Sequence, residues 1–270
     1  MLLRTLLLGL AAASLSPAWA VADDCGDAAA LVQQAYPKAR KNADGTSFTL
    51  EPHTSIALTF AYGDPPGLVC KIWPVHDDLL LVAVPLMEGS QPSDYAHAGD
   101  IELLIVDRKS RQVLQPGLMN DDAIAIRKVE LDTGRYALAP DVTAFGLRIE
   151  MANNSLPNPF SETDLRLYAV DGDSLRMVLD GLVVGGNGGE GDTNCAGYFH
   201  TSRVSLAMSP AKHHGYHDIT VVEQMDTDNP LPDKDGECQS HPGKSVSQTY
   251  RLRYDGSRYT APAGLKALEP

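Results

Sequence analysis

Three stretches of the sequence combine residue types that could bind a cation or take part in catalysis. The first, "MDTDNPLPDKDGEC", carries five acidic residues within twelve positions: Asp226, Asp228, Asp233, Asp235 and Glu237. Carboxylate oxygens are the ligands that Ca²⁺ prefers, and an Asp-x-Asp spacing places two of them on one side of an extended chain. Pro230 and the position of Gly236 depart from an EF-hand loop. The stretch predicts a structural Ca²⁺ site, with a solvated acidic loop as the alternative.

The second stretch, "KHHGYHD", brings His213, His214 and His217 close to Asp218. A zinc protease would need H-E-x-x-H on a helix, and Gly215 disfavours a helix here. In an extended chain His213 and His217 point to one side, while His214 and Asp218 point to the other. The histidines therefore form an alternative metal site, and the competing interpretation is a polar turn that precedes a strand.

The third stretch, "VVGGNGGEGDTNCAGYFH", is rich in glycine. A phosphate-binding loop would need a lysine and a following helix, and neither is present. The part "GGNGGE" is similar to a calcium-binding nonapeptide, but one copy cannot stack on a neighbour. We expect a flexible, acidic surface loop that contacts a partner. The predicted binding residues of this loop are Gly185, Gly186, Asn187, Gly188, Gly189, Glu190 and Asp192.

Signatures of catalysis are few in this sequence. The G-x-S-x-G motif of many serine hydrolases is missing, although a catalytic triad on another fold needs no such motif. Two carboxylates for glycoside hydrolysis are available among 35 acidic residues. However, aromatic residues make up only 6% of the chain, and Trp73 is the one tryptophan outside the first twenty residues. The sequence therefore favours a protein without enzymatic activity.

The first twenty residues have the pattern of a secretory signal. Arg4 precedes an apolar run at 6–15, and an A-x-A cleavage site follows at 18–20. A second small-x-small triple overlaps it, so cleavage is expected after Ala20 or Ala22. No later run is long enough for a membrane helix. We expect an exported protein, periplasmic or extracellular, without a membrane anchor.

The four cysteines lack the spacing of a metal site, and an exported chain with an even number of cysteines favours disulfides. Three connectivities are possible. We predict the local pairs Cys25–Cys70 and Cys195–Cys238, each of which closes a loop of moderate length. In the chain-entropy model each closure stabilises the fold by roughly 4 kcal/mol.

The chain is acidic, with a net charge of −13. The predicted signal contains one basic residue, Arg4, and no acidic residue, so its removal changes the net charge to −14. Such a surface repels nucleic acid and favours cationic partners or divalent metal ions.

Apart from one helix, the patterns indicate short β-strands. Good helix formers at 27–36 with Pro37 as a stop predict a helical segment at 21–45, followed by one β-rich domain at 46–270. Each of the stretches 101–114, 165–179 and 250–262 has the pattern of a β-hairpin. The fold class is mainly β, antiparallel, either propeller-like or a large sandwich or meander. Four long loops are expected, at 90–99, 153–164, 185–197 and 226–245.

These patterns favour an exported binding protein whose partner is another, cationic protein. An inhibitor or immunity-type role against a cationic envelope or secreted enzyme would suit the charge. Two alternatives remain: a metal-assisted hydrolase that uses the three histidines, and a calcium-stabilised structural protein.

Overall fold

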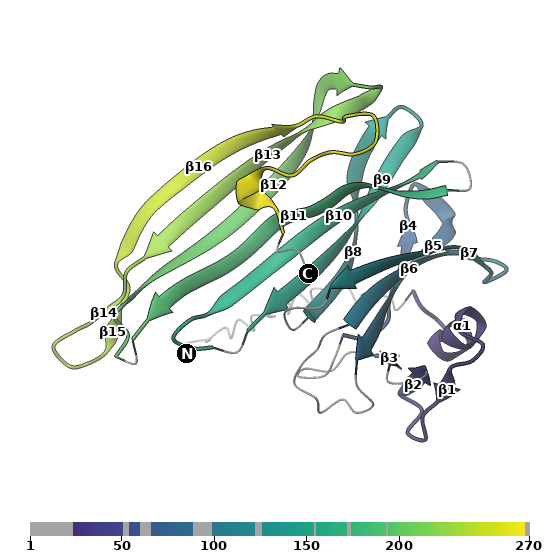
Figure 1. Ribbon diagram of the computed structural model, residues 1–270, viewed down its shortest axis with the longest axis horizontal. Helices are drawn as coiled ribbons and strands as arrows, with labels where there is room; N and C mark the ends of the chain where they lie inside the picture. Colours follow the sequence, from purple (N-terminus) through teal and green to yellow (C-terminus); the bar gives the residue numbers. More distant parts are fainter. Residues whose placement is uncertain are drawn as a thin grey trace, which may run out of the picture.

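The computed structural model describes residues 24–50, 54–59, 66–88, 99–121, 126–153, 155–171, 174–192 and 194–267. The predicted signal at 1–20 and nearly all of the predicted loop at 90–99 lie outside these ranges. The described chain is mainly β, with antiparallel strand pairs and one short α-helix near its start, as the sequence predicted (Figure 1). In this part of the chain no helix has the length and apolarity needed to cross a membrane.

The strands form two seven-stranded sheets. Sheet A has the order β1-β2-β3-β5-β6-β7, with β4 also paired to β5. Its strands are β1 (Arg40–Lys41), β2 (Ser47–Leu50), β3 (Thr54–Ala57), β4 (Val69–Trp73), β5 (His76–Glu88), β6 (Gly99–Asp107) and β7 (Val113–Asp121).

Sheet B has the order β16-β13-β12-β11-β10-β9-β8. Its strands are β8 (Ile126–Ala139), β9 (Val142–Ala152), β10 (Phe160–Asp171), β11 (Ser174–Gly191), β12 (Gly197–His213), β13 (Tyr216–Asp228) and β16 (Pro242–Leu252). A small ribbon of β14 (Leu231–Pro232) and β15 (Cys238–Gln239) lies between β13 and β16 along the chain. Because β8 to β13 are neighbours both in sequence and in the sheet, the meander is confirmed, and the described strands form no propeller blades.

Two of the three predicted hairpins are full strand pairs. The stretch at 101–114 lies in β6 and β7, and the stretch at 165–179 lies in β10 and β11. The third stretch, at 250–262, is reduced to the end of β16 and a single bridge between Tyr254 and Tyr259.

Helix α1 (Ala28–Ala35) covers the outer face of sheet A. The Asp27 side chain accepts a hydrogen bond from the Ala30 N–H at 2.9 Å and so caps the first turn. Leu31 and Val32 are buried in a cluster with apolar residues of sheet A. The helix ends before Pro37, since a proline disfavours helical geometry at the residue that precedes it.

A second core lies between the two sheets. Trp73 of sheet A contacts Phe145 of sheet B edge-on, with ring centroids 5.1 Å apart. Tyr168 lies opposite Phe145 in the β9–β10 register and stacks on it at 5.8 Å. Directly opposite residues of an antiparallel pair share a face, so strand pairing aligns these rings in one core.

A third core lies on the other face of sheet B, beneath the C-terminal segment (residues 253–267). The Tyr259 N–H donates to the Val178 carbonyl at 2.7 Å, and the Ala267 N–H donates to the Gly181 carbonyl at 2.8 Å. Tyr259 and Leu265 are buried among apolar side chains of sheet B. The C-terminal segment therefore shields the base of this face from water.

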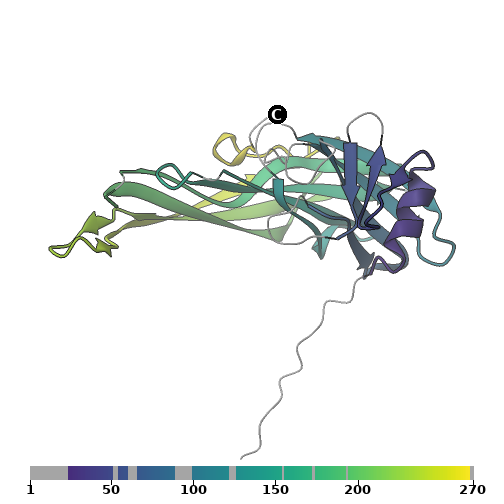
Figure 2. The ribbon, with the colours of Figure 1, turned by 90° about the horizontal axis from the view of Figure 1, so that it is seen from below.

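Sheet B is longer than the layers that cover it. Its distal half (residues 160–164, 185–191, 197–205, 222–228 and 242–249) extends beyond sheet A and ends at the β14–β15 ribbon (Figures 1 and 2). Seen from below, this half is a thin extension of the two-sheet body (Figure 2). It positions the site described next.

Three of the predicted loops are corrected by the strand assignments. The glycine-rich stretch lies mostly inside β11, which runs to Gly191 and pairs with β10 and β12. The predicted loop at 226–245 contains the end of β13, the β14–β15 ribbon and the start of β16. The predicted loop at 153–164 becomes strand β10 from Phe160 onward. These three stretches have the composition of loops. In the structure, however, strand ladders satisfy their backbone donors and acceptors.

Both predicted disulfides are confirmed. Cys25 is bonded to Cys70, which ties the chain just before α1 to β4. Cys195 is bonded to Cys238, which ties the turn between β11 and β12 to β15 at the tip of the distal half. Each bond closes a loop of moderate length, with sequence separations of 45 and 43.

Candidate functional site

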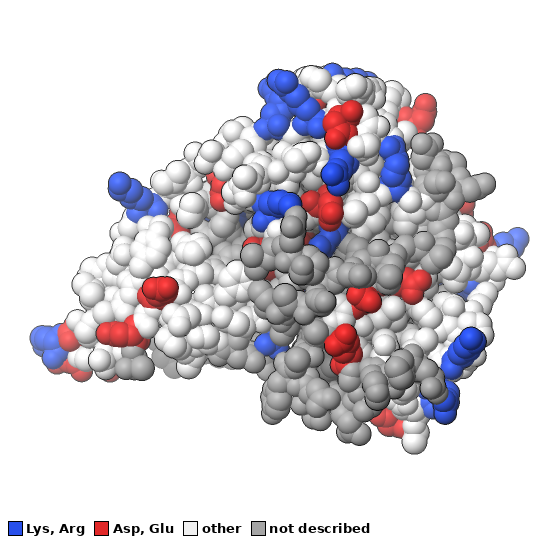
Figure 3. All heavy atoms as spheres, in the orientation of Figure 1, with Lys and Arg blue, Asp and Glu red and all other residues white. Residues whose placement is uncertain are grey.

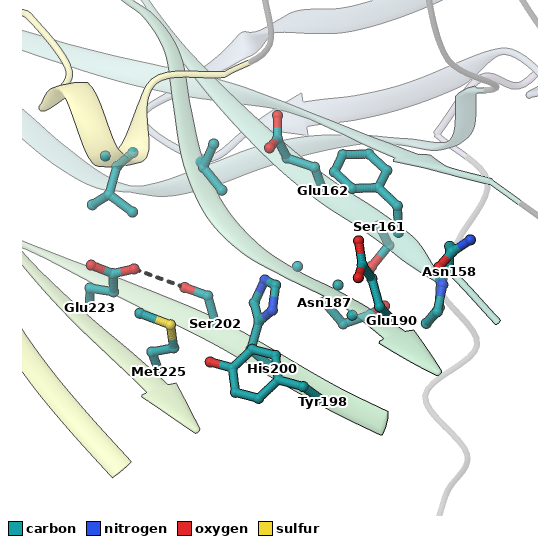
Figure 4. A pocket seen from close by; sticks show the side chains of 18 of the residues that line it. Asn158, Ser161, Glu162, Asn187, Glu190, Tyr198, His200, Ser202, Glu223 and Met225 are labelled. Atoms are coloured by element: carbon teal, nitrogen blue, oxygen red, sulfur yellow. Dashed lines mark hydrogen bonds between the residues drawn. The ribbon is translucent and has the colours of Figure 1, made fainter. Parts of the chain in front are cut away.

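A groove of about 800 Å³ lies on one face of the distal half of sheet B. Side chains of β10 to β13 form its floor. One wall is the turn at Asn158 and Pro159, and the other is the short 3-10 helix η1 (Ala263–Leu265) with Lys266. Figure 4 shows the labelled side chains that line this groove, which we call the acidic groove.

Strand register decides which side chains enter the acidic groove. Gly186 lies opposite Glu162, and Gly188 lies opposite His200. Ser202 lies opposite Met225. Opposite residues share a face, so these side chains belong to the same face as the apolar core under the C-terminal segment. The groove is the continuation of that face beyond η1, where the covering segment ends.

Three carboxylates from three strands give the groove its charge: Glu162, Glu190 and Glu223. In the view of Figure 4 they are arranged around the imidazole of His200. Lys266 is the one Lys or Arg among the described lining residues. The side chains that line the groove are therefore predominantly acidic.

Glu223 is held in place by two hydroxyl donors. The Ser202 hydroxyl donates to Oε1 at 3.3 Å, and the Tyr250 hydroxyl donates to Oε2 at 3.1 Å. Desolvation and the hydrogen bond to this carboxylate raise the pKa of Tyr250, so the tyrosine remains a neutral donor. The carboxylate is thus oriented before any ligand arrives.

The described residues of the groove do not form the linked hydrogen bonds of a nucleophilic site. Catalysis by a serine would require its hydroxyl to donate to a neighbouring base such as histidine. The Ser202 hydroxyl donates instead to Glu223. Among the described residues none forms a hydrogen bond with the His200 ring, and the Tyr198 ring lies 6.4 Å from it between centroids.

An apolar end adjoins the acidic groove. Tyr198 and Met225 line both the groove and a second hollow of about 390 Å³, which extends to Gly243 and Val246 on β16. Tyr198 is 51% exposed and Val246 is 50% exposed. Carboxylates and uncovered apolar side chains therefore lie side by side on one sheet face.

The glycines of β11 make room for rings of β12. A Cβ atom at Gly188 would lie 2.8 Å from Cε1 of His200. Gly189 and Gly191 are covered in the same way by the Phe199 ring. A glycine inside a strand often marks such a close approach. The glycine-rich composition thus allows aromatic packing across two strands.

Replacing Gly189 by alanine is expected to lower the free energy of unfolding by about 1 to 3 kcal/mol. The new Cβ would lie 2.5 Å from Cδ1 of Phe199 and 2.5 Å from the Tyr198 carbonyl oxygen, which is backbone and cannot rotate away. The matched control is Gly185→Ala, where the nearest atom is the Ser202 oxygen at an ordinary 3.7 Å. Chemical denaturation measures both variants. Equal stability of the two variants would show that ring packing does not require these glycines.

The predicted calcium ligands are engaged with protein donors. Asp226 accepts hydrogen bonds from Ser245 at 2.6 Å and from Arg203 at 2.9 Å, and these bonds lower the pKa of its carboxyl group. Asp233 accepts the N–H groups of Asp235 and Glu237, which likewise lower its pKa.

The other members of this predicted set are also dispersed. Asp228 accepts a hydrogen bond from Ser240, and Asp235 lies 3.4 Å from the Lys234 ammonium. Glu237 is exposed in the turn of the β14–β15 ribbon. Within the described ranges no three His, Cys, Asp or Glu side chains gather into a group that could hold a metal ion. The structure therefore does not assemble the predicted calcium site.

The three histidines are separated by a tight turn. His214 and Gly215 form this turn with positive φ values of 47° and 87°, which places His213 and His217 on opposite strands. His213 Nδ1 lies 2.6 Å from Oδ1 of the fully buried Asp218, and His217 Nδ1 lies 2.7 Å from the Ser209 carbonyl oxygen. The extended chain was expected to place Asp218 on the same side as His214, and this is corrected. Asp218 is paired with His213, because the chain reverses at His214 and Gly215.

The glycine-rich stretch does contribute to the acidic groove, although as a strand. Five of its predicted residues line the groove: Gly186, Asn187, Gly188, Gly189 and Glu190. Asp192 instead accepts the N–H groups of Asn194 and Ala196 in the following turn. Sequence reasoning missed Glu162, Tyr198, His200, Ser202, Glu223 and Met225. Tyr198, His200 and Ser202 alternate along β12, and this alternation could have indicated that they share one face. It does not identify which strands lie beside β12.

Comparison of the chain with protein-family models, with curated proteins and with solved structures gives no match.

Proposed function

We propose that this chain is an exported binding protein that holds a cationic segment of another protein in the acidic groove. The observation that carries the proposal is the set of three carboxylates, Glu162, Glu190 and Glu223, placed on one exposed sheet face beside apolar side chains. The two disulfides support export, because oxidising compartments favour such bonds.

The shape of the site favours a protein segment over a small molecule. Small-molecule pockets bury most of the ligand surface. Here the acidic groove is open and continues into the hollow at Val246, so a ligand that fills both must be elongated. Lysine and arginine side chains suit such a surface, since their long stems pack on apolar groups while the charged ends reach carboxylates.

The overall charge supports a cationic partner. The chain has a net charge of −13, and opposite potentials on two proteins accelerate their encounter. On the face seen in Figure 3, acidic and basic side chains are interspersed and no single acidic field dominates. Specific attraction should therefore come from the groove itself. An inhibitor or immunity-type role against a cationic envelope or secreted enzyme is consistent with this mode of binding.

Replacing Glu190 by glutamine is expected to weaken binding of a cationic probe by about 1.4- to five-fold, since an exposed ion pair contributes about 0.2 to 1 kcal/mol. The probe is an acetylated and amidated ten-residue peptide of alternating valine and lysine, measured by fluorescence anisotropy at low and high salt. Glu190 is exposed, and glutamine has nearly the same side-chain shape as glutamate, so the fold should be unaffected.

The matched control for this experiment is Glu237→Gln, which makes the same charge change in the exposed β14–β15 ribbon. It should bind the probe as the unchanged protein does. Equal weakening in both variants would assign the attraction to net charge alone and would overturn the proposed groove.

A further inference from the structure

Strand β16 forms one edge of sheet B and is unusually open. Within the described chain, β13 is the one strand that pairs with it, so its outer side has no strand partner. Every residue from 242 to 249 is exposed. An edge strand presents unpaired N–H and C=O groups that can pair with another chain, and natural proteins usually protect such edges.

The opposite edge of the same sheet shows that protection. Strand β8 carries five charged residues and three irregularities in its pairing with β9. The charged residues are Arg127, Lys128, Glu130, Asp132 and Arg135. Charges and bulges are the usual means by which edge pairing is prevented. Strand β8 is therefore a protected edge.

Strand β16 lacks these features along its centre. Between Lys244 and Arg251 the sequence is "SVSQTY", with no charge and no proline. Its pairing with β13 is regular from Asp226–Ser245 to Ile219–Leu252. The surface along β16 is mostly uncharged in Figure 3. This edge is regularly paired, exposed and suited to accept a further strand.

We infer that β16 receives an extended strand from the cationic partner, which thereby becomes the next strand of sheet B. This inference rests on the proposed function and adds to it the conformation in which the partner is recognised. Strand addition draws its affinity from backbone hydrogen bonds and its specificity from alternate side chains.

Continuity with the acidic groove identifies the occupant of the edge. Val246 lines the hollow that Tyr198 and Met225 share with the acidic groove. A strand added to β16 would place one row of its side chains next to Val246 and the other row next to Ser245 and Ser247. A cationic segment is favoured over a second copy of this chain, because two chains of net charge −13 repel each other.

Val246→Glu separates strand addition from simple charge attraction. If an apolar contact at the edge matters, the valine-lysine peptide should bind this variant about three-fold more weakly or worse, since the contact loses apolar burial. If only charge matters, the added carboxylate should strengthen binding. The control is Val75→Glu, which makes the same change at a 53% exposed valine between β4 and β5 and should leave binding unchanged.

Hydrogen exchange and a modified peptide complete the test. Binding is expected to slow amide exchange within 243–251, and a peptide with methylated alternate backbone nitrogens should lose at least about ten-fold in affinity because it cannot form the ladder. Binding that remains sensitive to Glu190→Gln but gives no protection in 243–251 would overturn the added strand and leave the groove intact. No binding at low salt would overturn both. Protection of 243–251 without peptide, in a concentration-dependent dimer, would assign the edge to a second copy.

Discussion

Replacing Cys25 and Cys70 together by alanine is expected to lower the free energy of unfolding by about 4 kcal/mol. The disulfide closes a loop with a sequence separation of 45, and the chain-entropy model gives roughly this value for such a loop. Cys25 is also 3% exposed and belongs to the core between α1 and sheet A, so the substitution removes buried contacts as well. Guanidinium unfolding of the unchanged protein and the double variant measures the difference.

Removal of the second disulfide serves as the comparison for removal of the first. Cys195–Cys238 has a separation of 43, so chain entropy alone predicts nearly the same loss. However, Cys238 is exposed, and the bond joins two segments at the tip of the distal half. Removing it should mainly increase proteolysis at the tip and should lower global stability by less. If the Cys25–Cys70 variant loses no more global stability than the Cys195–Cys238 variant, core packing around Cys25 adds nothing.

Replacing His213 by alanine is expected to lower the free energy of unfolding by about 3 kcal/mol, the upper part of the range for a buried polar group that loses its hydrogen-bond partner. Asp218 is fully buried, and its Oδ1 atom lies 2.6 Å from His213 Nδ1. Its other oxygen, Oδ2, has no hydrogen-bond partner among the described residues. The variant therefore leaves a buried carboxylate without its partner. Because the His213 side chain is 40% exposed, water can partly replace it, which limits the decrease in the free energy of unfolding.

A double variant tests whether charge is the cause. Adding Asp218→Asn to His213→Ala removes the uncompensated charge and should recover part of the lost stability. His214→Asn is the control, because asparagine tolerates the positive φ of this exposed turn residue. Thermal and chemical unfolding measure all three variants. A double variant less stable than His213→Ala alone would contradict the explanation by charge.

Much of the fold could be read from local patterns. The helix at α1 and the hairpins β6–β7 and β10–β11 depend on residues near one another in sequence. The two disulfides were predicted from the even number of cysteines and from a preference for loops of moderate length. The Asp27 cap and Pro37 stop act within a few residues of the helix, and an Asp-led turn between alternating runs predicts a hairpin. Local interactions of this kind are visible without the tertiary structure.

The candidate site could be predicted only in part. The glycine-rich stretch was expected to bind a partner, and its residues Gly186 to Glu190 do line the acidic groove. The acids at 226–237 were expected to converge, yet Asp226 and Asp233 are engaged by separate donors. Charge composition predicts which residue types are plentiful. It cannot predict which carboxylates face each other, because a shift of one residue in strand register reverses the face of every side chain.

By itself the sequence determined that this is an antiparallel, disulfide-bonded β protein with a single short helix near its start, since those features follow from local propensity, periodicity and cysteine spacing. Only the tertiary structure decided that the glycine-rich stretch is a strand, that Glu162, Glu190 and Glu223 share one groove and that β16 is an open edge. The glycines are accommodated in β11 because the rings of Phe199 and His200 on the neighbouring strand occupy the space that they leave. That packing depends on which strands become neighbours and in which register, which no single stretch of the chain specifies.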